Sequence, residues 1–169
     1  MNYSDRMASR SALAHAPAAD PRALQRLDLQ LCFALYSSSL LMTKLYKPVL
    51  APLGLTYPQY LVLLVLWETD RIAVGELGTR LYLDSGTLTP LLKRMEAAGL
   101  LTRTRAADDE RRVIVALTAA GRALRRKAEK VPLAVAGATG CDLNQITELT
   151  AQLQLLRENL AGQIDPGLS

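Results

Sequence analysis

The most informative part of the chain is residues 74–99, which read VGELGTRLYLDSGTLTPLLKRMEAAG. Its first eight residues form a short helical pattern that we expect to end near Tyr82. Asp84 or Ser85 then caps a second helix, and Gly99 suits the left-handed residue that follows a helix end. Two short helices around a tight turn are typical of a helix-turn-helix, in which the second helix reads DNA.

A proline complicates this second helix. Pro90 falls inside the pattern, and a proline in a helix interior removes one backbone hydrogen bond. The sequence predicts either that the helix begins near Thr87 or that it kinks at Pro90, and both remain open.

The residues after this motif predict a β-hairpin. Leu100 to Arg105 reads as one strand, and Arg112 to Leu117, rich in β-branched residues, reads as another. Residues 106–110 form a polar tip between them. A hairpin directly after a reading helix is a wing, so we predict a mainly α fold with a small β-hairpin, a winged helix-turn-helix.

Further helices are expected before this motif. Apolar residues follow one stripe over residues 23–46, and Pro48 and Pro52 should break that helix. Residues 57–69 are apolar nearly all round, which indicates a buried helix, and Thr56 can cap it.

After the hairpin, Thr118 begins a long helical pattern that we expect Pro132, Gly137 and Gly140 to interrupt. A last helix is predicted over residues 142–161. Its apolar residues step by three and four, which is typical of a coiled-coil seam: Ile146, Leu149, Leu153, Leu156 and Leu160. The seam either packs against a second subunit, which we favour, or covers the core of its own domain.

The chain therefore divides into five expected parts. These are a mobile N-terminal arm (1–22), a dimerisation helix (23–50), a winged helix-turn-helix (51–120), C-terminal dimerisation helices (121–162) and a tail (163–169).

Charge is concentrated in one part of the chain. The whole chain has 169 residues, 50% of them hydrophobic, and a net charge of +4. Residues 93–127 contain ten Lys or Arg against four acids, so this window alone carries +6. A basic face of this kind indicates a nucleic acid partner, although most charge runs are only solvated surface.

Composition excludes several other classes. The single histidine, His15, and two distant cysteines provide no usual zinc ligand set or catalytic triad, so we expect no metal, no cofactor and no enzyme. The most apolar run, Leu61 to Trp67, is too short to cross a membrane, and no secretory signal is evident. A cytoplasmic chain is expected, in which two cysteines indicate free thiols or a redox switch.

Candidate DNA contacts lie on both predicted parts of the reading surface. On the helix, short hydroxyl side chains can reach base edges and two cations can bind bases or phosphates: Ser85, Thr87, Thr89, Lys93 and Arg94. On the wing, four cations stand beside an acid: Arg103, Arg105, Asp109, Arg111 and Arg112. The alternatives are helix caps for the hydroxyls and a weak surface ion pair for Asp109 and Arg111.

These residues resemble a known family. Residues 74–96, and the run DDERR at 108–112 leading to Leu117 and Thr118, are similar to the MarR family of transcription regulators. The set Cys32, Tyr46 and Tyr57 resembles the organic hydroperoxide regulators within it, and Cys141 resembles their two-cysteine subtype.

The resemblance implies a homodimeric repressor on an inverted-repeat operator in double-stranded DNA. It also implies an Asp109–Arg111 pair that fixes the wing so that an arginine enters the minor groove. It places Cys32 near the dimer interface, with the hydroxyls of Tyr46 and Tyr57 reaching it from the partner. Organic hydroperoxide then converts Cys32 to a sulfenic acid, which condenses with Cys141 of the opposite subunit. The disulfide shifts the dimer helices and releases DNA.

Other interpretations stay open beside this one. A cysteine on an apolar helix is usually an inert core residue, and two tyrosines can simply pack at an interface. A repressor relieved by a small phenolic ligand would keep the fold, and would still respond to its signal after Cys32→Ser. A thiol peroxidase would consume peroxide catalytically and would lack sequence-specific DNA binding.

Overall fold

The computed structural model describes residues 25–107, 109 and 111–164, and the expected N-terminal arm (1–22) lies outside them. The chain separates into two units, Met1–Met42 and Thr43–Ser169, each of which is described by itself. No single helix among the described residues is long and apolar enough to span a membrane.

The first unit contains a 3₁₀ turn, η3 (Leu27–Leu29), and the first part of helix α2 (Leu31–Leu50). The expected helix 23–46 is wrong at both ends. Gln30 adopts an extended conformation (φ −83°, ψ 116°) that separates η3 from α2. At the other end α2 continues through Pro48 to Leu50, which is fully buried. We infer that burial of Leu50 offsets the hydrogen bond that Pro48 cannot donate.

The second unit contains the predicted winged helix-turn-helix. A 3₁₀ turn, η4 (Ala51–Leu53), leads to four helices: α3 (Tyr57–Glu68), α4 (Val74–Leu81), α5 (Ser85–Ala97) and α6 (Ala119–Ala128). We call residues 57–128 the winged-helix module. Its core contains leucines from all three of its first helices, among them Leu66, Leu77 and Leu92.

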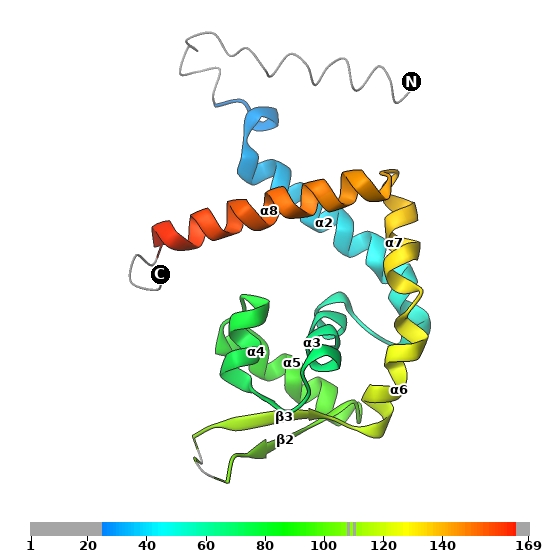
Figure 1. Ribbon diagram of the computed structural model, residues 1–169, viewed down its shortest axis with the longest axis vertical. Helices are drawn as coiled ribbons and strands as arrows, with labels where there is room; N and C mark the ends of the chain where they lie inside the picture. Colours follow the sequence, from blue (N-terminus) through cyan, green and yellow to red (C-terminus); the bar gives the residue numbers. More distant parts are fainter. Residues whose placement is uncertain (1–24, 108, 110, 165–169) are drawn as a thin grey trace. The chain divides into compact units, whose positions relative to one another are not determined.

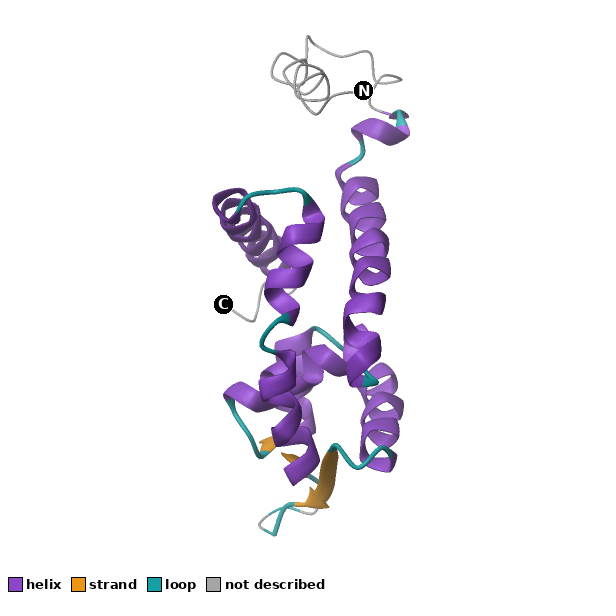
Figure 2. Cartoon of the chain, turned by 90° about the vertical axis from the view of Figure 1, so that its right-hand side faces the viewer, coloured by secondary structure: helices purple, strands orange, loops and turns teal. Residues whose placement is uncertain are grey.

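A three-stranded antiparallel sheet forms the wing and its base (Figure 2). The expected hairpin consists of β2 (Leu101–Arg105) and β3 (Val113–Leu117), with Leu101 opposite Leu117. A short strand that the sequence analysis did not predict, β1 (Ile72–Ala73), pairs with β3 through Ile72 and Val115. Two residues are too few to show an alternating pattern, so only the tertiary pairing reveals β1.

Polar contacts join α3 to the base of the wing and to α6. One carboxylate oxygen of Asp70 accepts from the Leu117 amide at 2.8 Å, and the other is 2.8 Å from the Arg122 guanidinium. The Trp67 indole N–H donates to the Gly121 carbonyl at 3.0 Å. Position 121 accepts only glycine, because a Cβ there would lie 2.1 Å from the carbonyl oxygen of Leu100. These contacts hold the wing at a defined place beside the helices.

Helix α5 begins at Ser85 and is continuous through Pro90 to Ala97. The alternative in which it begins near Thr87 is therefore wrong. Asp84 provides the predicted cap, since its carboxylate accepts from the Thr87 amide at 2.9 Å.

Two further helices complete the second unit, α7 (Val131–Thr139) and α8 (Leu143–Ile164). The expected interruption at Pro132 lies slightly earlier, at residues 129–130, because a proline is tolerated in the first turn of α7. Gly140 ends α7 as expected, whereas the expected break at Gly137 is wrong, because this residue lies inside the helix. Helix α8 extends from α7 back over α4 (Figure 1), and none of its residues is buried.

Candidate DNA-reading surface and thiol site

The outer face of α5 carries the predicted reading residues because its inner face is anchored in the core. Leu88 and Leu92 are buried, whereas Ser85 and Thr87 are exposed. The Thr87 hydroxyl donates to Asp84 at 2.9 Å, so this hydroxyl keeps its acceptor lone pairs for a further partner. The same two contacts from Thr87 lower the pKa of Asp84, which stays ionised at neutral pH.

A hollow of about 900 Å³ lies between α4, the start of α5 and the wing. Its lining brings together helix and wing residues that are far apart in the sequence, including Ser85, Thr89, Arg103, Arg111 and Arg112. Lys93 and Arg94 do not line this hollow, but both are exposed on the later turns of α5. Hydroxyls beside cations suit a surface that binds base edges and phosphates together.

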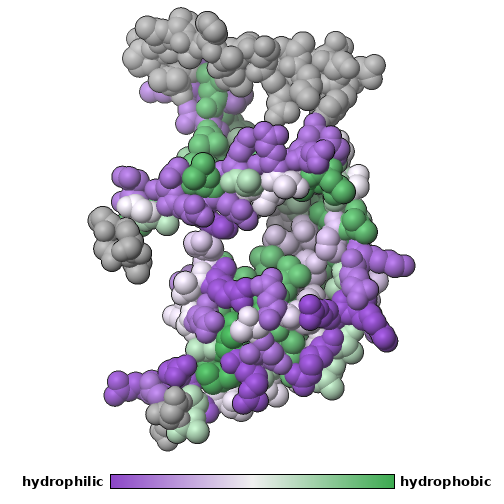
Figure 3. Space-filling model, in the orientation of Figure 1, coloured by the Kyte–Doolittle hydropathy of each residue, from purple (hydrophilic) through white to green (hydrophobic). Residues whose placement is uncertain are grey.

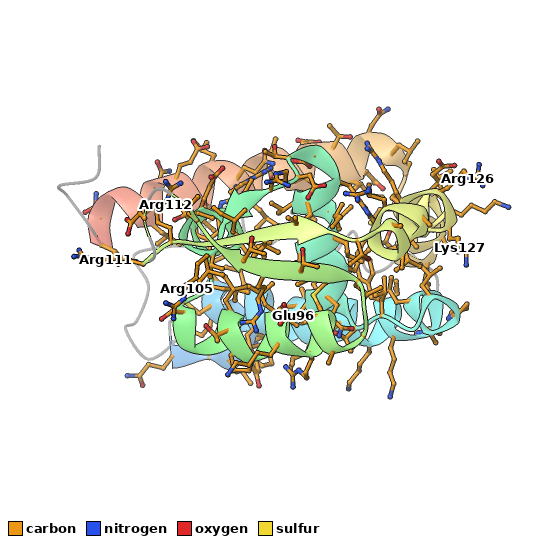
Figure 4. All side chains as sticks on the ribbon, turned by 90° about the horizontal axis from the view of Figure 1, so that it is seen from below. Glu96, Arg105, Arg111, Arg112, Arg126 and Lys127 are labelled. Carbon is orange, nitrogen blue, oxygen red and sulfur yellow. The ribbon has the colours of Figure 1, made fainter. Side chains whose placement is uncertain are left out.

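The wing tip is held by its own backbone and by Asp109. The Arg111 amide donates to the Asp109 carboxylate at 3.0 Å, and the Arg112 amide donates to the Asp109 carbonyl at 2.9 Å. The contact that is observed comes from the backbone amide of Arg111, and the expected pair between the two side chains stays a prediction. Figure 4 shows Arg111 and Arg112 at one end of the module, with Arg126 and Lys127 at the opposite end. Hydrophilic side chains also dominate the described part of the wing in Figure 3.

Arg103 has a partner that the sequence analysis did not name. Its guanidinium donates to Glu96 of α5 at 2.7 and 3.0 Å, and its amide donates to the same carboxylate at 3.0 Å. These bonds lower the pKa of Glu96. Arg103 therefore joins the reading helix to strand β2, and no spacing rule in the sequence reveals a pair that forms across the turn at Gly99.

Both cysteines are exposed free thiols. Cys32 lies in the first turn of α2, in the first unit. Cys141 lies between α7 and α8, where its amide donates to the Thr139 hydroxyl at 3.2 Å and its sulfur approaches the Thr139 carbonyl at 3.9 Å. No described group of three or more His, Cys, Asp or Glu side chains could hold a metal ion.

Tyr46 and Tyr57 meet in the second unit, although they come from different helices. Their ring centroids are 4.4 Å apart, and Tyr60 lies 6.1 Å from Tyr46. Burial, followed by the neighbouring Tyr57 and Tyr60, raises the pKa of Tyr46 to about 12. Burial also raises the pKa of Tyr57 and of Tyr60. All three phenols keep their protons at neutral pH and can donate hydrogen bonds.

Tyr60 was missed by the sequence analysis. It follows Tyr57 by three positions, so both lie on the same face of α3, and this spacing is the signal that could have found it.

The seam of α8 is mostly exposed within the described part of the second unit. Ile146 and Leu156 are half-buried, and the other predicted seam residues, Leu149, Leu153 and Leu160, are exposed. Packing of the seam against a second subunit therefore stays a prediction.

Comparisons with known proteins agree with this geometry. Residues 44–127 match a family model described as transcriptional regulator SarA/Rot. The chain is 50% identical over 135 residues to the organic hydroperoxide resistance transcriptional regulator of Bacillus subtilis, covering 80% of this chain and 92% of that protein.

Solved structures of AbfR, a protein of Staphylococcus epidermidis, are also similar. Reduced AbfR bound to DNA superposes with a TM-score of 0.69 at 36% identity, covering 86% of this chain and 99% of that one. Disulfide-formed AbfR gives a TM-score of 0.53 at 38% identity, covering 80% of this chain and 96% of that one. The Bacillus subtilis relative and the matching family model are transcription regulators and not enzymes, so the thiol peroxidase alternative is set aside. The chain belongs to the MarR family of winged helix-turn-helix transcription regulators, among the relatives of the organic hydroperoxide resistance regulator.

Proposed function

We propose that this chain is a homodimeric repressor that binds an inverted-repeat operator and releases it when organic hydroperoxide oxidises Cys32. The observation that carries the proposal is the meeting of Tyr46 and Tyr57, with ring centroids 4.4 Å apart. Two phenols can donate hydrogen bonds to the same sulfur only if they lie close together, and these two meet although they come from different helices. In the assembled dimer they donate hydrogen bonds to the Cys32 thiolate of the partner chain, which stabilises the charged sulfur without a cation.

The oxidation takes place in two balanced steps. The Cys32 thiolate attacks an oxygen of the hydroperoxide, an S–O bond forms, the O–O bond breaks, and the alkoxide takes up a proton to leave as an alcohol. The Cys141 sulfur of the partner chain then attacks the Cys32 sulfenic acid. An S–S bond forms, the S–O bond breaks, and water leaves with the proton of the Cys141 thiol. Two thiols and one hydroperoxide thus give one disulfide, one alcohol and one water.

Two features of the chain support the remaining parts of the proposal. Exposed seam residues on α8 require an apolar cover, which a second copy provides with the same seam. The hollow beside α5 presents hydroxyls and arginines to DNA, and two copies related by two-fold symmetry read two half-sites. The relative AbfR has been observed both reduced on DNA and in a disulfide form. We place this activity in the cytoplasm, where thiol reductants restore the repressor.

The test begins with an operator selected from random duplex DNA by the reduced protein, so that no target gene is assumed. Binding is measured by fluorescence anisotropy before and after one equivalent of cumene hydroperoxide. Wild type should lose affinity and run as a cross-linked dimer on a non-reducing gel, and dithiothreitol should reverse both changes. Cys32→Ser should bind the operator and ignore the hydroperoxide. Cys141→Ser should react at Cys32 without forming the cross-link.

Release of Cys32→Ser by the hydroperoxide would contradict a sensing role for this sulfur. Release of that variant by a small phenol, with no effect of oxidation on wild type, would favour the ligand-relieved repressor instead.

A further inference from the structure

Tyr82 occupies an unusual place, the first position after helix α4 in the turn between α4 and α5. Its backbone is left-handed (φ 55°, ψ 38°), and among the described residues only Arg71 shares a positive φ without being glycine. Glycine or asparagine is the usual choice here, because a Cβ disfavours this conformation. The turn itself needs no aromatic ring, since the Leu83 amide closes it by donating to the Gly78 carbonyl at 3.0 Å. The ring therefore calls for a separate explanation.

The ring of Tyr82 contacts helix α8. The guanidinium carbon of Arg157 lies 4.8 Å from the ring centroid, within the range of a cation–π interaction. Tyr82 is otherwise 65% exposed and contributes nothing to the core. Its main observed contact thus joins the C-terminal helix to the turn that immediately precedes the Asp84 cap of the reading helix.

Helix α8 links this contact to Cys141. The helix begins two residues after the cysteine, and its start is fixed by reciprocal bonds of 2.9 and 3.0 Å between Asp142 and Gln145. Arg157 follows Leu143 by fourteen positions, so the two are separated by about 21 Å along one continuous helix. Gly140, with φ 72°, precedes the cysteine and separates α8 from α7. A displacement of Cys141 is therefore carried along α8 to Arg157.

We infer that the contact between Arg157 and Tyr82 is a positioning contact that holds the reading helix in its DNA-binding orientation, and that disulfide formation at Cys141 breaks it. The second half of this inference rests on the proposed function. Arg157 acts through Tyr82, the turn and the cap, and does not line the hollow beside α5. Tyr82 does line that hollow, so Arg157→Gln is the variant that separates positioning from a direct contact of Tyr82 with DNA.

The test is a double-mutant cycle on operator binding by the reduced protein. Tyr82→Leu removes the ring and keeps an apolar side chain, and Arg157→Gln removes the cation. Each should weaken binding roughly two- to fivefold for each subunit, the effect expected of an exposed cation–π contact. The double variant should lose no more than either single one. Tyr82→Phe and Arg157→Lys keep the interaction and should retain the affinity of wild type.

Arg126→Gln is the matched control, since it removes an exposed arginine from α6 at the end of the module opposite the wing. Urea unfolding of every variant checks that the module is folded. Two further measurements separate positioning from plain structural support. The rate of thiol loss with cumene hydroperoxide should be the same in all variants. In Tyr82→Leu and Arg157→Gln the reduced protein should lose affinity and the oxidised protein should not, because oxidation has already broken the contact. The ratio of oxidised to reduced dissociation constants should therefore shrink by the factor by which the reduced variant is weakened.

Several results would overturn the inference. Equal losses in Tyr82→Phe and Tyr82→Leu would assign the effect to the hydroxyl, and multiplying losses in the double variant would show two independent contributions. If both variants keep the wild-type ratio of oxidised to reduced dissociation constants, disulfide formation does not break the contact between Arg157 and Tyr82. The proposed switch itself is not contradicted by that result. Should hydroperoxide fail to release even wild type, the proposed function falls, and the cycle alone still decides whether the contact positions the reading helix.

Discussion

Leucines of α5 and of α8 have opposite environments in the same chain. Leu88 and Leu92 of α5 are 1% and 0% exposed, whereas Leu149 and Leu160 of α8 are 53% and 50% exposed. The winged-helix module buries these leucines within one chain. Helix α8 presents an apolar seam that is mostly exposed within the described part of the second unit, and its burial against a second chain is our proposal. The comparison teaches that the helix predicted to read DNA is packed within one chain, whereas the helix predicted to dimerise is left mostly exposed.

The largest effect should come from placing a charge on the seam. Leu153→Asp would bury two unpaired carboxylates in each dimer, so the dimer should dissociate and operator affinity should fall by more than about a hundredfold. Analytical ultracentrifugation and anisotropy measure the two losses. Ala151→Asp adds the same charge on the opposite face of α8 and should remain dimeric. A dimeric Leu153→Asp would place the interface elsewhere.

A truncation in the core tests the contrast between the buried leucines of α5 and the exposed leucines of α8. Leu88→Ala should lower the free energy of unfolding by about 2–5 kcal/mol, because it leaves a cavity under the reading helix. Leu155→Ala on exposed α8 should cost less than about 0.5 kcal/mol when urea unfolding is followed at concentrations where the protein is monomeric. Equal losses at the two positions would mean that α8 is already packed within one subunit.

Removal of a wing cation should change the salt dependence of DNA binding more visibly than the affinity. Arg111→Gln should lose one phosphate contact in each subunit. The slope of the logarithm of the association constant against the logarithm of the salt concentration should therefore flatten by about one unit for each lost contact. The measurement is a salt titration on the selected operator. Arg126→Gln, at the opposite end of the module, should leave the slope unchanged, and an unchanged slope in Arg111→Gln would exclude Arg111 from the contact.

The smallest effect is expected in the stability of the protein at acidic pH. The pKa of Asp84 is lowered from 3.8 in the folded protein, so its contribution to stability is complete above that value and disappears as the pH falls through the lower, folded-state pKa. An asparagine at this position keeps an acceptor for the Thr87 amide but does not titrate. Asp84→Asn should therefore match wild type at neutral pH and show a flatter loss of stability below about pH 4 in urea unfolding. If the stability of wild type and of Asp84→Asn falls in parallel as the pH is lowered, the charge of Asp84 contributes little to folding stability.

Local signals predicted most of the winged-helix module. The cap at Asp84, the glycine after α5 and the β-branched strand before Thr118 each act on neighbouring residues, so their effects can be read from short windows. The meeting of Tyr46 with Tyr57 was implied by family resemblance alone, and their ring contact is now observed within one unit. That the pair serves Cys32 stays a prediction.

The sequence by itself determined where most of the helices and the hairpin lie, which residues are candidates for DNA contact and which helix carries an apolar seam, because periodicity and capping depend on contacts a few residues apart. Only the tertiary structure decided that Arg103 binds Glu96, that β1 joins the sheet, that α2 continues through Pro48 and that Arg157 rests on Tyr82. Each of these depends on how elements pack. The free energy of such packing comes from groups that the chain brings together only when it folds.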